Sequence, residues 1–412
     1  MRGAMTASLV TSKLDPRLDF FRGLALCIIL YAHMRWSIVA AFIPAQFGLS
    51  DAAHMFVFMS GCAAAIAFGG VFRRSGFFLG TARIVYRCWQ LYIAHLMVFF
   101  AVAALAAAGN DLFARPDYIQ IMYIPLFFAD PATAIVRLFG LSYVPPYLDI
   151  MPMYMTVLAM VPVAVLLARI RPWLAPAAAV TLYLVANWRG WNFLADPSDG
   201  RGWFLNPLAW QLIFLTGFAL VSGWLKPPPN RPWIFWLGVG VLMLSLAIKL
   251  DDIQKSSWPL SAMHDWVAAH TDKTFLDPFA FGHFLALAYV TNYLLSDRLH
   301  VLEHWLLRPI MVCGQQALAM FLFGLILSDL GGMAFDQLGD DWTIQVSVNV
   351  IALGLQLGAA YVVAWYKSTP WRRRETHPPA SAALRLPLQG ETARSAAPVP
   401  LPRPRVAVEP GE

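Results

Sequence analysis

Two ionisable residues, Arg22 and His33, lie within an apolar stretch near the start of the chain. They are eleven residues apart, which in a helix is almost three full turns. Both side chains therefore lie on one face, roughly 16 Å apart along the axis. A histidine can take a proton from a hydroxyl group near neutral pH, and an arginine can hold a phosphate or a carboxylate. This spacing predicts an acid–base group and an anion-binding group on one helix face.

Each of these residues also has a purely structural interpretation. Asp19 lies one turn before Arg22, so the two can pair and anchor the end of the helix. His33 can be a hydrogen-bonded packing residue, and Arg35, on a different face near the outer end, suits an interfacial anchor. Ionisable residues within a membrane span are costly unless they face a partner or a polar cavity. The pair on one face therefore favours a functional role.

Further polar and aromatic residues collect at the predicted outer ends of later helices. Aromatic residues beside carboxylates suit a sugar ligand, which stacks on rings and donates hydroxyl hydrogens to carboxylates. Tyr and Trp at a membrane interface are also typical of a plain aromatic belt. The four cysteines have no metal-ligand spacing, and no metal site is expected. The candidate substrate-binding residues are Asp19, Asp51, Asp149, Tyr154, Asn206, Trp210 and His283.

Membrane helices are the elements that must position these residues. Of the 412 residues, 59% are hydrophobic and only 13% are charged, and the mean hydropathy is +0.58. A soluble domain carries about 25% charged residues. Apolar blocks of about 18–25 residues, the length that crosses a bilayer as a helix, recur along the chain. We therefore predict an all-α polytopic integral membrane protein with about ten spans, at 20–42, 51–70, 86–109, 150–168, 173–188, 205–225, 232–249, 279–296, 309–329 and 344–366.

The distribution of charge sets the orientation and the partners. If both termini are cytoplasmic, lysines and arginines concentrate in the cytoplasmic segments, as the positive-inside rule requires. Acidic residues collect in two outer loops. The net charge of +6 is therefore a feature of topology, and no nucleic-acid partner is expected. The bilayer of a bacterial inner membrane is the expected surrounding.

Two segments do not fit the pattern of spans. The apolar stretch 118–144 is interrupted by Pro125, Asp130 and Pro131, so its halves are too short to span and suit re-entrant or interfacial elements. The chain after Arg374 is rich in Pro, Ala and Arg and lacks apolar periodicity. We expect a membrane domain over residues 1–370 and a disordered cytoplasmic tail over 371–412.

Five segments carry a resemblance to a known family. The run from Asp15 to Arg22, followed by Tyr31-Ala-His33, resembles the opening of the membrane acyltransferase-3 superfamily with its Arg-x10-His signature, and Phe56–Gly61 resembles that superfamily's second-helix motif. Three further segments narrow the resemblance to the OpgC family, namely Pro146–Tyr154, Asn206–Phe214 and His283–Tyr289. The resemblance covers roughly residues 14–330. It departs from the family pattern at Gln315-Gln316, where relatives carry a histidine–serine pair.

The resemblance implies an activity as well as a fold. OpgC-like proteins are implicated in adding succinyl groups to osmoregulated periplasmic glucans. The implied co-substrate is an acyl-CoA donor, succinyl-CoA, made in the cytoplasm, with a glucan acceptor in the periplasm and no resident cofactor. By the superfamily pattern His33 is the catalytic residue and Arg22 its donor-side partner. Direct transfer and an acyl-histidine intermediate both remain open, as do O-acetylation of another surface polysaccharide and a transporter or flippase.

Overall fold

The computed structural model describes residues 15–113, 116–250, 255, 257–369 and 371. The described residues up to Ser368 form one compact unit. Within the described residues the regular secondary structure is helical, apart from one isolated bridge between Leu194 and Gly202. The predicted disordered tail lies outside the described residues, except for Trp371. The all-α fold class is thus confirmed.

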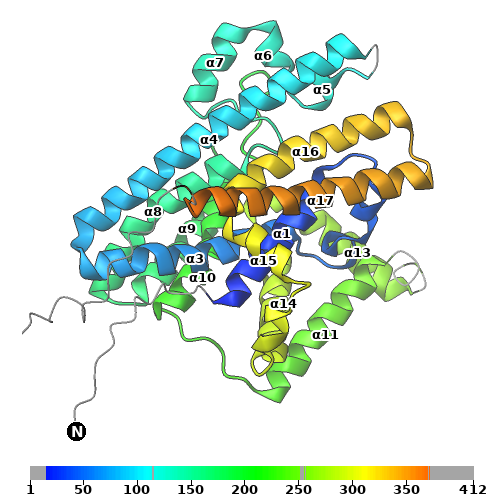
Figure 1. The fold of residues 1–412 in the computed structure, drawn as a ribbon. Helices are drawn as coiled ribbons and strands as arrows, with labels where there is room; N and C mark the ends of the chain where they lie inside the picture. Colours follow the sequence, from blue (N-terminus) through cyan, green and yellow to red (C-terminus); the bar gives the residue numbers. More distant parts are fainter. Residues whose placement is uncertain (1–14, 114–115, 251–254, 256, 370, 372–412) are drawn as a thin grey trace, which may run out of the picture. The chain divides into compact units, whose positions relative to one another are not determined.

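Each predicted span contains a helix in the structure (Figure 1), but the ninth, 309–329, covers parts of two helices that are separated at Gln316. By length and composition, six of the helices are suited to crossing a membrane: α3, α4, α8, α11, α16 and α17. The chain is therefore a membrane protein, while the count of ten crossings and the side of each terminus stay predictions. The long helices are α1 (Pro16–His33), α3 (Ala52–Arg74), α4 (Gly76–Leu112), α8 (Ile150–Ile170), α9 (Leu174–Arg189), α10 (Pro207–Ser222), α11 (Pro232–Lys249), α14 (Pro278–Leu295), α16 (Ala317–Leu338) and α17 (Trp342–Lys367).

Short helices fill the connections. The interrupted stretch 118–144 forms three of them, and proline opens both the second and the third, because proline lacks the N–H that an interior position needs. The helix in the loop before α14 is not predicted from the sequence. The short helices are η1 (Ile38–Phe42), α2 (Pro44–Phe47), α5 (Tyr118–Ile121), α6 (Pro125–Ala129), α7 (Pro131–Phe139), α13 (Trp258–His270), η2 (Lys273–Phe275), η3 (Leu299–Glu303) and α15 (Arg308–Gln315).

The first predicted span, 20–42, is wrong in its second half, because α1 ends at His33. The chain then turns, with Trp36 at φ +65°. Two polar side chains of α17 bind the turn: Gln345 accepts from the Ile38 backbone at 3.0 Å, and Asn349 Oδ1 accepts from the Ser37 hydroxyl at 2.5 Å. Non-helical backbone within a membrane protein is tolerated where other protein groups satisfy it. These contacts therefore allow the helix to stop at the histidine.

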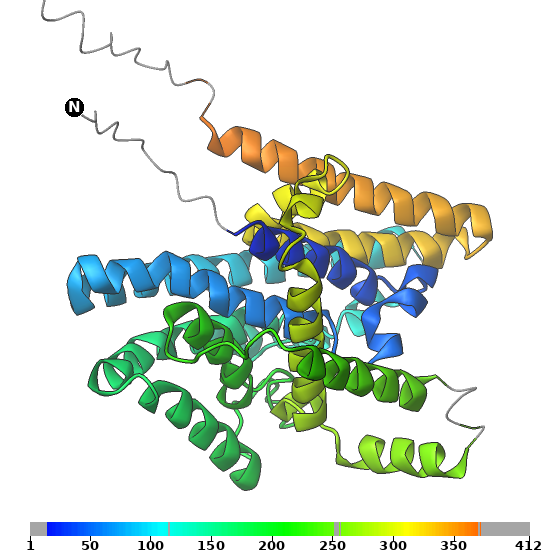
Figure 2. The same cartoon turned by 90° about the horizontal axis from the view of Figure 1, so that it is seen from below.

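The first helix is held among its neighbours by very close contacts. It packs against α3, α15 and α16, and α16 and α17 lie side by side (Figures 1 and 2). Glycine makes the approach to α15 possible, since a Cβ on Gly314 would lie 1.8 Å from the carbonyl oxygen of Asp19. A Cβ on Gly61 of α3 would lie 2.0 Å from the carbonyl oxygen of Phe214 in α10. Small residues at such crossings are typical of membrane helix packing.

Candidate active site

His33, the last residue of α1, lies against a cavity of about 210 Å³. We call this space the tyrosine cavity, after the polar and aromatic residues that line it: His33, Arg35, Tyr123, Tyr147 and Asp329. The imidazole packs against the ring of Tyr147, with 4.8 Å between ring centroids. Its Nδ1 is buried and has no hydrogen-bond partner among the described residues. The other nitrogen, Nε2, is not among the buried atoms that lack a partner.

The two tyrosines of this cavity are held in an unusual backbone conformation. Tyr123 has φ +58° and Tyr147 has φ +69°, a left-handed region that non-glycine residues rarely adopt. Both residues are about half exposed, at 51% and 50%, and their rings meet edge to face at 6.3 Å. Strained backbone tends to persist where function requires the side chain to point in one direction. Here it presents two aromatic rings beside a histidine.

Two charged residues complete the lining of the tyrosine cavity. Arg35 was expected to be an interfacial anchor. In the structure its guanidinium pairs with Asp336 at 2.6 Å, and Arg35 also lines the cavity. Asp329 lies in α16, and its carboxylate has no hydrogen bond or ion pair to any described residue. The cavity thus contains a base, an unpaired carboxylate and two rings.

Arg22 lies elsewhere on α1, as its spacing predicts, and it does not line the tyrosine cavity. Its Nε is buried without a partner in the described part of the chain. Tyr154, Asp19 and Arg87 lie within its electrostatic range. Asp19 forms no ion pair with Arg22, and accepts a hydrogen bond from Gln315 at 3.1 Å instead. The structure therefore brings Arg22, Asp19 and Tyr154 together, apart from His33.

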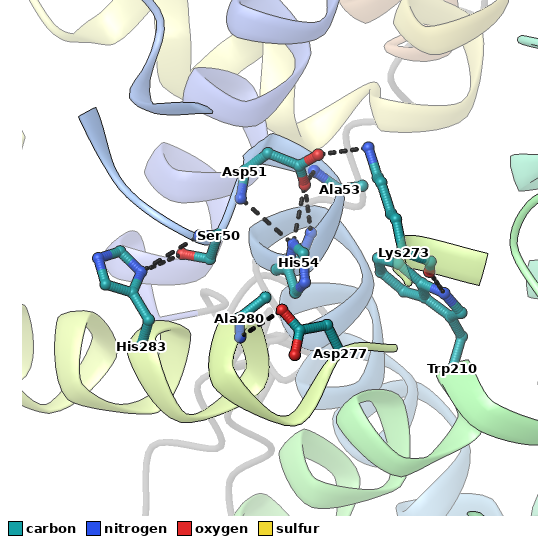
Figure 3. Close-up of polar contacts among 9 residues, drawn as sticks. All are labelled: Ser50, Asp51, Ala53, His54, Trp210, Lys273, Asp277, Ala280 and His283. Carbon is teal, nitrogen blue, oxygen red and sulfur yellow. Dashed lines mark hydrogen bonds and ion pairs between the residues drawn. The ribbon is translucent and has the colours of Figure 1, made fainter. Parts of the chain in front are cut away.

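Asp51 borders a second cavity of about 260 Å³, which we call the lysine cavity. Its carboxylate caps α3, lies 2.8 Å from His54 Nδ1, and pairs with the ammonium group of Lys273 (Figure 3). Burial raises the pKa of Asp51, but the His54 hydrogen bond and the Lys273 charge outweigh burial and hold this pKa below its ordinary value. The charged and titratable residues lining the lysine cavity are Asp51, His54, Lys249, His264, Lys273 and Asp277.

The other acidic and histidine side chains near the lysine cavity are also bonded within the protein. Asp277 caps α14 by accepting from the backbone N–H groups of Phe279 at 2.9 Å and Ala280 at 3.3 Å. The predicted residue His283 is buried, and its Nδ1 lies 2.8 Å from the Ser50 hydroxyl (Figure 3). The contact between Ser50 and His283 joins the segment before α3 to α14, and His283 lines neither cavity.

Asn206 and Trp210, predicted from the start of α10, are fully buried. The Asn206 side chain caps α10 through the Leu208 N–H at 3.0 Å and donates to the carbonyl of Trp191 at 2.6 Å. The Trp210 indole donates to the carbonyl of Lys273 at 3.0 Å. In the structure these two side chains hold loops in place and line neither cavity.

Asp149 is a buried carboxyl group that follows the lining residue Leu148 in sequence but does not itself line the tyrosine cavity. Its Oδ2 has no partner among the described residues. Burial raises the pKa of Asp149 to about 6, and backbone hydrogen bonds and the charges of Lys273 and Arg201 offset only part of this effect. The group is therefore half protonated near pH 6.

Sequence reasoning missed two residues of the tyrosine cavity. Asp329 was placed at the end of a predicted span, 309–329, where a carboxylate is unremarkable, whereas α16 continues to Leu338. Tyr123 lies in the interrupted stretch, between the short helices α5 and α6. A longer ninth span would have revealed Asp329 as an intramembrane carboxylate.

Among the described residues, His, Cys, Asp and Glu side chains do not gather in threes as metal ligands would.

Comparisons with known proteins agree with the five motifs. The family model described as OpgC protein matches residues 14–368, which is most of the chain. No curated protein and no solved structure matches the chain. The matched range contains α1 with Arg22 and His33, and all residues of the tyrosine cavity. This membrane protein therefore belongs to the OpgC family and is an OpgC-type acyltransferase.

Proposed function

We propose that the protein transfers a succinyl group from cytoplasmic succinyl-CoA to hydroxyl groups of osmoregulated periplasmic glucans across the bacterial inner membrane. The observation that carries this proposal is the position of His33, a base at the end of α1 beside two half-exposed tyrosine rings and an unpaired carboxylate. Rings and carboxylates suit a sugar, and the histidine supplies the group that activates its hydroxyl. Membership in the OpgC family supports the acyl chemistry.

The reaction needs one base and a thioester. A glucosyl hydroxyl donates its proton to Nε2 of His33 while its oxygen attacks the thioester carbonyl carbon of succinyl-CoA. The tetrahedral intermediate collapses as the carbon–sulfur bond breaks, and the CoA thiolate takes the proton back from the imidazolium. An ester and free CoA result. In a two-step variant, His33 first accepts the acyl group and then passes it to the hydroxyl.

Arg22 suits the donor side of this reaction. Its guanidinium is three helical turns from His33, roughly 16 Å along α1, and its buried Nε lacks a protein partner among the described residues. Arg87 lies within electrostatic range and adds positive charge. A pair of arginines is well matched to the phosphates of CoA, because guanidinium groups bind phosphate in a bidentate manner. The acyl end then extends along α1 toward His33.

Mass spectrometry of periplasmic glucans tests the proposal. A strain lacking the gene should produce glucans without succinyl esters, and the wild-type gene should restore them. His33→Ala should abolish restoration while the protein level in the membrane stays normal. His270→Ala is the matched control, because that histidine is exposed on α13, away from the tyrosine cavity. Near-normal succinylation by the His33→Ala variant would rule out this role of His33.

The same experiment separates the competing activities. Loss of acetyl esters, instead of succinyl esters, in the deletion strain would identify an O-acetyltransferase. Glucans that are unchanged in mass in the deletion strain would contradict acyl transfer to this acceptor and favour a transporter or flippase. Radiolabelled succinate trapped on the protein in the absence of glucan would indicate the acyl-histidine route.

A further inference from the structure

Asp329 is a carboxylate within a helix that is long and apolar enough to span the membrane. It is not near a helix start, so it has no capping role of the kind that Asp51 and Asp277 have. An ionisable residue at such a position is costly unless it faces a partner or a polar cavity. The structure provides the cavity, because Asp329 lines the same space as His33.

Contacts between α16 and α1 place Asp329 beside the end of α1. The adjacent hydroxyl of Ser328 donates to the carbonyl of Leu30 in α1 at 2.9 Å, one turn before His33. Gly331 and Gly332 follow Asp329 in α16. Because they lack side chains, the residues just after α1 can pack directly on α16. A Cβ on Gly331 would lie 2.7 Å from Met34, and one on Gly332 would lie 3.2 Å from Arg35. These contacts hold Asp329 next to the C-terminal end of α1, where His33 lies.

The charged neighbours of Asp329 do not neutralise it. Arg35 is near enough to interact electrostatically, but its guanidinium forms its ion pair with Asp336. Tyr147 is the other polar side chain of the lining within electrostatic range. One arginine therefore faces two carboxylates, so this part of the cavity does not favour an anion. It favours a neutral ligand with many hydroxyl donors.

We propose that Asp329 positions the acceptor sugar, accepting hydrogen bonds from hydroxyls of a glucosyl unit whose ring stacks on Tyr123 and Tyr147. This inference rests on the proposed function and assigns the tyrosine cavity to the acceptor. The half-exposed rings provide the stacking surface, and the carboxylate fixes which hydroxyl faces His33. The carboxyl oxygens of Asp329 have no partner among the described residues and line the cavity, so they are free to accept hydrogen bonds from sugar hydroxyls.

An alternative role for Asp329 is to orient the imidazole of His33, as a carboxylate does in a catalytic triad. The structure does not favour this role, since no hydrogen bond joins the two side chains and the buried Nδ1 of His33 is unpartnered. The two roles differ kinetically. A sugar-binding carboxylate affects the KM for glucan, whereas an orienting carboxylate affects kcat at saturating glucan.

Steady-state kinetics of the full-length protein in lipid nanodiscs test the inference. The substrates are succinyl-CoA and unsubstituted periplasmic glucan isolated from the deletion strain. Asp329→Asn should raise the KM for glucan about tenfold or more, the usual effect of losing a buried hydrogen-bond acceptor, and leave the KM for succinyl-CoA within about twofold. Tyr123→Ala should also raise the KM for glucan, by about fivefold or more. Asp340→Asn is the control, because Asp340 is exposed beyond the end of α16.

Each outcome has a distinct meaning. An unchanged KM for glucan in an active Asp329→Asn variant would overturn the inference, and so would a loss confined to kcat. Thermal unfolding of the same samples shows whether the variants are folded. Should Asp329→Asn fail to fold, Tyr123→Ala decides alone, with an unchanged KM for glucan as the overturning result. Wild-type protein that transfers no succinyl group would instead contradict the proposed function.

Discussion

The tyrosine cavity and the lysine cavity are similar in size and both contain histidine and aspartate, yet they differ in how those groups are bonded. In the lysine cavity Asp51 caps a helix, binds His54 and pairs with Lys273. In the tyrosine cavity, His33 and Asp329 have no such partners among the described residues. Polar groups that form hydrogen bonds within the protein stabilise the fold, and removing one of them leaves its buried partner without a hydrogen bond. Unsatisfied groups beside a cavity are available to a ligand, at a cost in stability.

The largest expected contrast is between two histidines. His33→Ala should lower succinyl transfer by about 100-fold or more, the usual contribution of a general base, with little change in the midpoint of thermal unfolding. His54→Ala should do the reverse, because it removes a hydrogen bond to a charged group and lowers the free energy of unfolding by about 2 kcal/mol. Activity per folded molecule and thermal unfolding of both variants measure this contrast. Equal effects of the two substitutions on activity would erase the distinction between the cavities.

A second contrast concerns the pH dependence of Asp149. The pKa of Asp149 is about 6 in the folded protein, above the ordinary value of 3.8, because the group is buried. Between pH 4 and pH 6, Asp149 loses its proton in the unfolded chain but largely keeps it in the folded protein. The free energy of unfolding therefore falls as pH rises, by about 3 kcal/mol over this range. Asp149→Asn should therefore be more stable than the wild type above pH 6, and equally stable near pH 4. Unfolding curves from pH 4 to pH 8 test this, and a variant less stable at pH 8 would contradict it.

The contribution of Asp51 to the free energy of unfolding should depend on pH in the opposite direction. Its pKa is lowered in the folded protein by His54 and Lys273 despite burial, so it contributes stability above its ordinary pKa and loses that contribution as pH falls. Asp51→Asn keeps a residue able to cap α3 but should lower the free energy of unfolding at pH 7 by about 2 kcal/mol. The difference from wild type should shrink on acidification below pH 4. A pH-independent difference would point to lost packing instead of lost charge.

The smallest effect is expected at Tyr147. Tyr147→Gly relieves a backbone at φ +69°, worth about 1 kcal/mol, and this gain offsets part of the lost contact with His33. We expect the free energy of unfolding to change by about 1 kcal/mol or less, while the KM for glucan rises about fivefold because the stacking surface is lost. Kinetics and thermal unfolding of one preparation measure both values. A large loss of stability with an unchanged KM would make Tyr147 a structural residue.

Much of the fold follows from local patterns in the sequence. Most of each apolar block is helical, and the interrupted stretch 118–144 forms short helices, because both hydropathy and proline act within a few residues. The end of α1 could not be predicted, since Gln345 and Asn349 of a distant helix satisfy the turn after His33. The predicted span containing Asp329 ends too early because it begins within α15, whereas the apolar helix α16 begins at Ala317 and continues to Leu338.

The sequence by itself determined an all-helical membrane protein of the OpgC type with Arg22 and His33 about three turns apart on one helix, because helical periodicity fixes the relation between residues of one segment. Only the tertiary structure decided which polar residues are free to bind a ligand. Asp51, Asn206, Trp210 and His283 have the residue types of a sugar site, but their hydrogen bonds are made within the protein. Asp329 and Tyr123 meet His33 through contacts between distant segments, which no local pattern encodes.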